Sequence, residues 1–249
     1  METHAPHVHH SSGKKFSQYF YEFLMLFLAV FFGFMAEYYL EHQIEKEKEG
    51  QFIKSLVSDL KDDIKLLDQN MTLQKSGLIL MDSLLTMVSD PELVKVKSDD
   101  VYYAARVGPR LGILLNNTKT FDQLKNSGGF RLIRKTETSD KIMFYYNQFP
   151  IVRLLEEIYM DEFSEYKIIG SKIFDPIVLR KMEMEDGSIR RTLIHPELRT
   201  YDIELLKELG FFIVQINGSR RSILRSEDGI KKSAKDLVEY LEKNYEMDH

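Results

Sequence analysis

The most apolar stretch of the chain lies near its N-terminal end and predicts a membrane-spanning helix. An uninterrupted apolar run, Phe23 to Ala36, has aromatic flanks that extend the apolar segment to residues 19–40. A helix rises about 1.5 Å per residue, so about 20 apolar residues cross a bilayer core about 30 Å thick. Tyrosines at both ends match the aromatic belts of membrane interfaces. Because the bulky Phe34 and Met35 stand where a signal-peptide cleavage site needs small residues, we expect an uncleaved anchor.

Two carboxylates interrupt this span and share one helical face with small residues. The face comprises Glu22, Leu26, Ala29, Gly33 and Glu37. Small residues let helix backbones approach closely in lipid, and intramembrane carboxylates tend to face protein or water. We therefore predict that this face contacts another helix. Two other interpretations stay open: both carboxylates reach the headgroup region and do nothing further, or the pair serves a proton or ion path.

Beyond the anchor, apolar residues recur in alternating steps of four and three and predict a long helix. They are Ile53, Val57, Leu60, Ile64, Leu67, Met71, Leu78, Met81, Leu85 and Val88, with Gln74 as the polar member of the series. Such a seam, sustained for about five heptads, is typical of a bundle helix or a coiled coil. Residues 41–50 are almost wholly charged and predict a solvated continuation of the anchor helix.

Capping residues, glycines and prolines divide the central part of the chain. Pro91 ends the long helix, because proline lacks a backbone donor. Ser98 starts a helix that stops at Gly108. Asn117 or Thr118 caps a short helix, which Gly128-Gly129 closes in a left-handed turn. The central part is therefore predicted to consist of short helices.

A second long helix is predicted from Thr138, with a kink near Phe149 because Pro150 removes one backbone hydrogen bond. Tyr145 and Tyr146 precede the kink, and together with Phe149 they form a candidate ligand cleft. Ordinary core packing with a solvated hydroxyl is the alternative for these aromatic residues.

The last part of the chain predicts two more helices after an irregular segment. The Asp186-Gly187 pair is consistent with a small β-hairpin near residues 180–195. Thr200 and Ser226 are the predicted caps of the two helices. An anion-binding patch or a solvated charged surface is expected from Arg190, Arg191, Arg199, Arg220, Arg221 and Arg225.

Composition excludes several classes of function. The chain has 249 residues, a net charge of −5 and no cysteine. The mild acidity argues against nucleic acid as a partner, and the lack of cysteine rules out disulfides, thiolate metal sites and a cysteine nucleophile. His4, His7, His9 and His10 are compatible with metal binding, but without further ligands they predict a disordered tail over residues 1–18. No catalytic or nucleotide-binding motif occurs, so we expect no enzyme, no cofactor and no metal site.

Three segments resemble an uncharacterised family of single-span membrane proteins of Gram-negative bacteria. They are EFLMLFLAVFFGFMAEYYLEH, QFIKSLVSDLKDD and TFDQLKNSGGFRLIRK, the last followed by the Tyr145-Tyr146 pair. The resemblance implies a short N-terminal tail, one span and a helical domain of unknown function. No functional residue can be carried over, because no activity is assigned to the family.

Together these patterns predict an all-α protein with a transmembrane anchor at residues 19–40 and a soluble helical domain at 41–249. We expect a bilayer and either a second copy or another membrane protein as partners. The expected location is the bacterial inner membrane with the domain in the periplasm, since long domains translocate largely regardless of charge. Two functions remain open: an interaction or scaffold protein, and a sensory or ligand-binding module with its site near Pro150.

Overall fold

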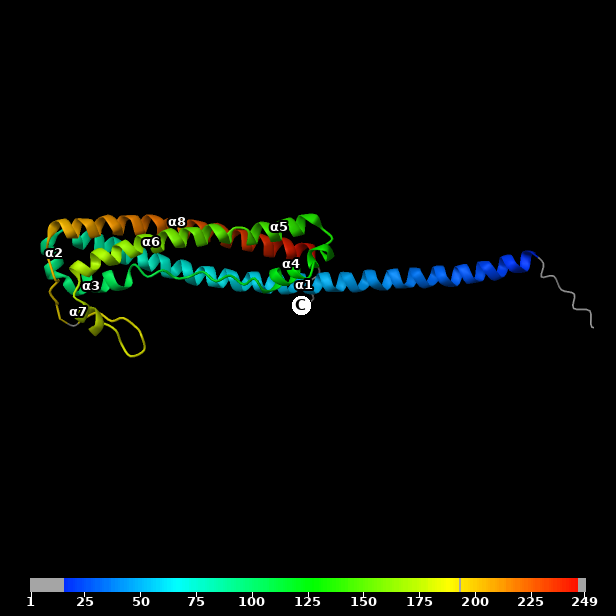
Figure 1. Ribbon diagram of the computed structural model, residues 1–249, viewed down its shortest axis with the longest axis horizontal. Helices are drawn as coiled ribbons and strands as arrows, with labels where there is room; N and C mark the ends of the chain where they lie inside the picture. The colour runs from blue at the N-terminus through cyan, green and yellow to red at the C-terminus, as the bar shows by residue number, and fades with distance from the viewer. Residues whose placement is uncertain (1–15, 193, 246–249) are drawn as a thin grey trace, which may run out of the picture. The chain divides into compact units, whose positions relative to one another are not determined.

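The computed structural model describes residues 16–192 and 194–245, and this part of the chain is all-α (Figure 1). The chain divides into two compact units, residues 1–51 and 52–249. The longest helix, α1 (Phe16–Val88), contributes to both units. It begins at Phe16, inside the predicted tail; the histidines of that tail lie outside the described residues. The second unit starts at Phe52, just before the apolar seam that begins at Ile53, and the charged residues 41–50 belong to the first unit.

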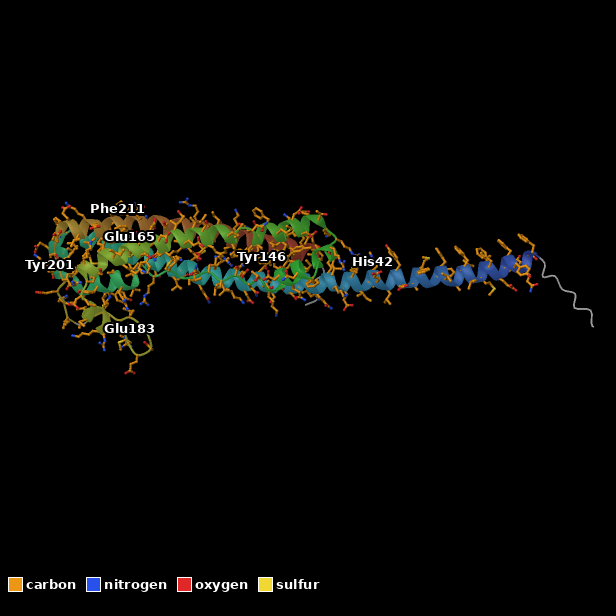
Figure 2. The ribbon with its side chains drawn as sticks, viewed as in Figure 1. His42, Tyr146, Glu165, Glu183, Tyr201 and Phe211 are labelled. Atoms are coloured by element: carbon orange, nitrogen blue, oxygen red, sulfur yellow. The ribbon has the colours of Figure 1, made fainter. Side chains whose placement is uncertain are left out.

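In the first unit, the side chains of α1 stand out from the helix on all sides (Figure 2). Its most apolar window has a mean hydropathy of 1.9, and none of that window is buried. Within the described residues, α1 is the one helix long and apolar enough to cross a membrane. An apolar surface of this extent is unfavourable in water, which is consistent with the predicted anchor.

The second unit is built on three long helical arms. They are α1 from Phe52 onward, the consecutive helices α5 (Thr136–Tyr146) and α6 (Phe149–Ile173), and α8 (Ile203–Asn244). Figure 1 shows the arms side by side, with α8 antiparallel to the others, and α6 packs most extensively against α8. The predicted seam of α1 faces the core, where Ile53, Leu60, Leu67 and Met81 are fully or almost fully buried.

Short helices close the two ends of the bundle. At one end lie α2 (Pro91–Val96), α3 (Ser98–Val107) and α7 (Pro176–Lys181), and at the other lie α4 (Lys119–Asn126) and the 3₁₀-helix η1 (Gly129–Leu132) (Figure 1). The boundaries at Ser98 and Gly108 are as the sequence predicted. Asp90 caps α2 by accepting from the Glu92 N–H at 3.0 Å. Gly128 has φ 68°, the left-handed turn expected of it.

One long connection of the bundle is extended rather than helical. We call residues 110–118, which join the turn after α3 to the start of α4, the strap. Gly108, just before the strap, approaches Gly77 of α1, and Asn117 near its end bonds to Asp63. The strap therefore runs along α1 in the antiparallel direction and links the two ends of the bundle.

Helix α8 is a single helix, where the sequence predicted two. Its cap is Asp202, whose carboxylate accepts from the N–H of Glu204 at 2.8 Å and of Leu205 at 3.1 Å. Ser226 lies in the helix interior. The prediction was wrong because polar residues continue the buried stripe through the middle of the helix. These buried polar residues are Asn217, Arg220 and Glu227.

The predicted kink at Pro150 is a break between two helices. Helix α5 ends at Tyr146 and α6 begins at Phe149, which puts Pro150 in the first turn of α6. Proline is well tolerated there because a first-turn N–H has no partner within the helix. The Gln148 side chain bridges the break by donating to the Phe144 carbonyl at 3.3 Å and to the Ser233 hydroxyl at 3.0 Å.

The predicted hairpin is reduced to a tight turn with one β-bridge, between Glu183 and Ile189. The Met184 N–H donates to the Ser188 carbonyl at 2.9 Å, and Gly187 takes φ 77°. No strand occurs in the described part of the chain. The Asp-Gly turn was therefore predicted at the right place, but it carries no sheet.

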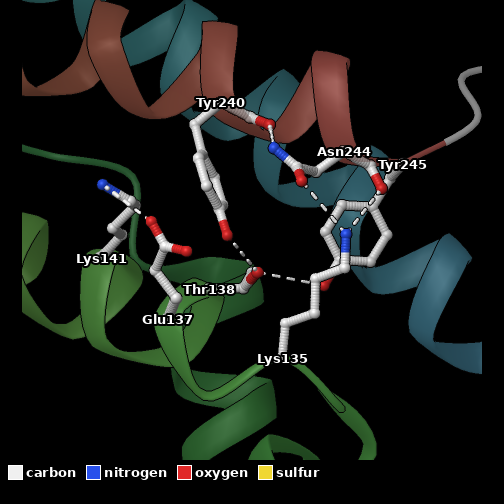
Figure 3. A network of polar contacts seen from close by, with 7 residues as sticks. All are labelled: Lys135, Glu137, Thr138, Lys141, Tyr240, Asn244 and Tyr245. Atoms are coloured by element: carbon white, nitrogen blue, oxygen red, sulfur yellow. Dashed lines mark hydrogen bonds and ion pairs between the residues drawn. The ribbon is translucent and has the colours of Figure 1, made fainter.

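The start of α5 is tied to the end of α8 by a polar network (Figure 3). Lys135 donates to the backbone carbonyl of Asn244 at 3.3 Å and to its Oδ1 at 3.1 Å. The Thr138 hydroxyl lies 3.3 Å from the Tyr240 hydroxyl and accepts from the Tyr245 hydroxyl at 3.2 Å. A cation at this position complements the negative end of the α8 dipole. The network therefore fixes the last turn of α8.

The corrected cap of α8 gives a direct test. Asp202→Ala removes an acceptor of two first-turn N–H groups and should lower the free energy of unfolding by about 1 kcal/mol. The matched variant Ser226→Ala should change it by less than about 0.5 kcal/mol, because no helix begins there. Urea denaturation of the full chain in detergent, followed by circular dichroism, measures both. A larger loss for Ser226→Ala than for Asp202→Ala would contradict the single-helix assignment.

Candidate functional site

The predicted anchor face lies along one side of α1 in the first unit. Ala29 and Gly33 stand exposed on this side, and a Cβ added at Gly33 would meet nothing within 4 Å. Aromatic rings line the other side of the helix: Phe27 stacks on Phe23 and on Phe31, with centroid distances of 6.2 and 6.0 Å. The helix thus separates bulky aromatic residues from small and acidic ones. The bulky side suits contact with lipid tails, and the side of small residues suits close contact with another helix.

The aromatic residues predicted near Pro150 are core residues. Tyr145 is fully buried, and its hydroxyl donates to Asp63 Oδ2 at 2.7 Å. Tyr146 stacks on Phe121 with centroids 4.2 Å apart and donates to the Asn117 carbonyl at 3.2 Å. Phe149 packs edge-on against Tyr145 at 5.4 Å. Burial raises the pKa of both tyrosines far above the ordinary value, so the hydroxyls act as hydrogen-bond donors.

A surface cleft lies beside Pro150. Its volume is about 440 Å³, and Tyr146, Phe149 and Pro150 line it together with Arg153 and Glu157. Tyr145 does not line this cleft, because its ring points into the core. The proposed ligand role of this cleft stays a prediction, now with two of its three aromatic residues on the wall.

Beside this cleft, two aspartates of α1 hold the end of the strap. Asp63 Oδ1 accepts from the Asn117 N–H at 2.6 Å. Asp59 accepts from the Asn117 side chain at 2.8 Å and from the Thr120 N–H at 3.0 Å. Burial raises the pKa of Asp63 above its ordinary value, while the Asn117 N–H and the Tyr145 hydroxyl oppose the shift. These carboxylates therefore satisfy backbone donors that no helix or sheet satisfies.

The other end of the strap is held by a buried arginine of α8. Arg220 donates from Nη1 to the Gly108 carbonyl at 2.7 Å and from Nη2 to the Arg110 carbonyl at 3.1 Å. Its Nη2 also donates to the Tyr159 hydroxyl at 2.5 Å. The Tyr159 hydroxyl in turn donates to the Pro109 carbonyl at 2.6 Å. These carbonyls lie at the C-terminal end of α3, where the helix dipole favours a cation. The guanidinium thus ties α8 to the strap, although burial lowers its pKa.

The middle of the strap is held from both sides. Gln74 of α1 donates to the Gly112 carbonyl at 3.4 Å. Glu156 of α6 accepts from the Leu114 N–H at 3.3 Å, and burial raises the pKa of this glutamate. Each long arm therefore contributes polar side chains to one extended segment.

Two glycines allow the close approach of these groups. A Cβ at Gly77 would lie 2.0 Å from Arg220 Nη1, and a Cβ at Gly112 would lie 2.1 Å from Asn70 Oδ1. Any larger residue would displace the hydrogen-bonding side chain beside it. The need for glycine at residues 77 and 112 thus comes from close packing against polar groups and not from the geometry of a turn.

The sequence left an anion-binding patch and a solvated charged surface open for six arginines, and three of them make separate contacts. Arg220 is buried, as described above, whereas Arg221 pairs with Asp82 at 3.2 Å and Arg191 pairs with Asp100. These cations make separate structural contacts rather than one anion-binding site.

A buried glutamate, Glu227 of α8, lies in the same polar layer. Its Oε1 accepts from the Asn70 side chain at 2.5 Å, while Oε2 is buried and has no hydrogen-bond partner among the described residues. Burial raises the pKa of Glu227 to about 7, Asn70 opposes the shift, and the nearby Glu156 adds to it. The nearest cation along α8 toward the C-terminus, Lys231, pairs with Asp68 instead. Glu227 therefore changes its charge near neutral pH.

The sequence interpretation noted Gln74 but missed the other polar residues of the core. A signal was present: Asn70 and Gln74 on α1, and Arg220 and Glu227 on α8, continue the spacing of the apolar residues around them. Polar residues at core positions indicate buried hydrogen-bonding partners. The identity of those partners could not be read from the spacing.

Glu227 gives a prediction about pH. Its pKa of about 7 in the folded protein exceeds the ordinary 4.5, so the unfolded chain releases this proton first. The free energy of unfolding should therefore fall as pH rises from about 4.5 to 7, by about 1–3 kcal/mol in total. Glu227→Gln, which cannot ionise, should be the more stable protein at pH 8 and nearly equal to the wild type at pH 4.5.

Denaturant titrations at these two pH values measure the effect, with the exposed Glu157→Gln as the matched control. If the stability difference between Glu227→Gln and the wild type is the same at both pH values, the pKa of Glu227 is not raised in the folded protein. The control measures what the removal of one exposed carboxylate does to stability at each pH.

Comparisons with known proteins offer no relative from which a role can be transferred. No family model, curated protein or solved structure matches the chain. Within the described residues, no group of three or more His, Asp or Glu side chains is placed to hold a metal ion. The anchor, the strap and the surfaces beside them are the features of the chain that bear on its function.

Proposed function

We propose that this protein is a membrane-anchored helical interaction or scaffold protein of the bacterial envelope. Its anchor lies in the inner membrane of a Gram-negative cell and contacts another helix, from a second copy or from a different membrane protein. The helical domain, residues 52–249, then holds a partner surface at the membrane.

The two-sided anchor is the observation that carries this proposal. A helix that only tethers a domain needs apolar residues on every side. Here Ala29 and Gly33 share one side with Glu22 and Glu37, while stacked phenylalanines occupy the other. Small residues permit close helix packing, and carboxylates within a span favour a protein or water environment.

The second candidate function is a sensory or ligand-binding module. The cleft of about 440 Å³ beside Pro150 favours it, because Tyr146 and Phe149 offer apolar wall and Arg153 and Glu157 offer charge. In this alternative the cleft, not the anchor face, carries the activity. This ligand-binding alternative would remain even if the anchor contacted no other helix.

The anchor face can be tested by site-specific crosslinking. The chain has no cysteine, so single variants Ala29→Cys and Gly33→Cys can carry a photoreactive maleimide. We expect discrete crosslinked products from both positions in native membranes, and little or none from Phe27→Cys and Phe31→Cys on the opposite side. No protein product at residues 29 and 33, or equal yields from both sides, would contradict a helix-contact face.

The proposed orientation puts the short tail in the cytoplasm and the domain in the periplasm. Lysines flank the span on both sides, as Lys14 and Lys15 before it and Lys46 and Lys48 after it. Their number does not decide the orientation, but long domains cross the membrane largely regardless of charge. Alkaline phosphatase fused after His249 should therefore be active in a Gram-negative host. Fluorescence of a cytoplasm-dependent reporter at the same position, without phosphatase activity, would reverse the orientation.

A further inference from the structure

We propose that the strap and the adjoining side of α6 form a docking groove for an extended peptide segment of a partner protein, one that carries apolar and basic residues. This inference names the partner surface of the interaction role and rests on that role. Four features support this inference. Buried and exposed side chains alternate along the strap, and the backbone groups of its outer residues are unused. Clefts lie beside the strap, and the residues that line them are charged.

The strap alternates between inward and outward residues, as an extended strand does. Leu114 is buried, whereas its neighbours Ile113 and Leu115 are 74% and 72% exposed. Gly112 faces inward, because a Cβ there would meet Asn70. The large side chains of Ile113 and Leu115 are thus exposed to solvent, while the inner side of the strap is fixed by contacts with the bundle.

The outer residues also have unused backbone groups. The carbonyl of Gly112 and the N–H of Leu114 bond to Gln74 and Glu156. Among the described residues, no hydrogen bond engages the N–H or C=O groups of Ile113 and Leu115. Such an extended edge, with fixed donors and acceptors, is the template to which a peptide adds as a strand.

Clefts lie along the strap where the side chains of an added strand would fall. One of about 730 Å³ is lined by Arg110, Ile113, Met160 and other residues of the strap and α6. The cleft of about 440 Å³ near Pro150 follows it. Arg153 and Glu157 line both, so the two are consecutive. At about 3.3 Å per residue, the strap of residues 110–118 spans about 30 Å, the length of an extended peptide of about nine residues.

The charge of the groove selects the peptide. Its charged lining residues are Asp122, Glu156, Glu157 and Asp161 against Arg110 and Arg153. Acidic groups outnumber basic ones, so lysine or arginine beside apolar residues complements the walls. An acidic or phosphorylated segment would be repelled.

The test uses the full chain in lipid nanodiscs and a phage-displayed library of random dodecapeptides. We expect enriched sequences with apolar residues at every second position and lysine or arginine between them. A synthetic copy should bind at least tenfold more weakly to Ile113→Asp than to the wild type. Ile79→Asp, which changes an isoleucine of α1 that is 71% exposed, should bind as the wild type does.

Strand addition is distinguished from simple apolar binding by methylating peptide nitrogens. Methylation of the alternate amides that face the strap should weaken binding at least tenfold, while methylation of the others should have little effect. Met160→Glu, on the opposite wall of the groove, is a second variant in case Ile113→Asp alters the fold, which circular dichroism would reveal.

No enriched peptide, equal binding to the Ile113→Asp and Ile79→Asp variants, or insensitivity to methylation would each overturn the groove. Peptide failure with intact crosslinks at residues 29 and 33 would leave the anchored interaction role in place. Peptide binding without those crosslinks would support the docking groove and contradict the proposed helix-contact face of the anchor.

Discussion

The backbone of the strap must find hydrogen-bond partners without forming a helix or a sheet. Each residue brings a donor and an acceptor, and a buried group left unpaired costs about 1–3 kcal/mol. The bundle meets this need with side chains, from Asp63 and Gln74 on α1, Glu156 on α6 and Arg220 on α8. These four polar side chains are thus explained by one extended segment packed among helices.

Because one segment binds all three arms, it also fixes their relative registers. A slide of α8 by one turn would remove Arg220 from the Gly108 carbonyl and leave a charge buried without its acceptors. A similar slide of α1 would separate Asp63 from Asn117. Apolar contacts alone tolerate such slides more easily, since one aliphatic residue replaces another. The polar contacts therefore specify one arrangement of the bundle, at the cost of keeping Glu227 buried beside Glu156.

The sequence predicted the features that depend on local pattern. The α1 seam, the helix start at Ser98 and the left-handed turn at Gly128 each depend on a few neighbouring residues. Helix α8 was divided wrongly because Arg220 and Glu227 resemble surface residues until their distant partners are known. The hydrogen bonds of the strap join residues far apart in the chain, so neither spacing nor composition reveals them.

The separation of the strap from α8 along the chain has a consequence for folding. Asp63 and Asn117 are 54 positions apart, whereas Arg220 and Gly108 are 112 apart. During synthesis the strap can meet α1 soon after both have emerged, but its carbonyls wait for most of the chain before Arg220 arrives. Contacts of such separation are slow to form. The contacts of the strap with α1 can therefore form before residue 220 has been synthesised, whereas its contacts with Arg220 require nearly the whole chain.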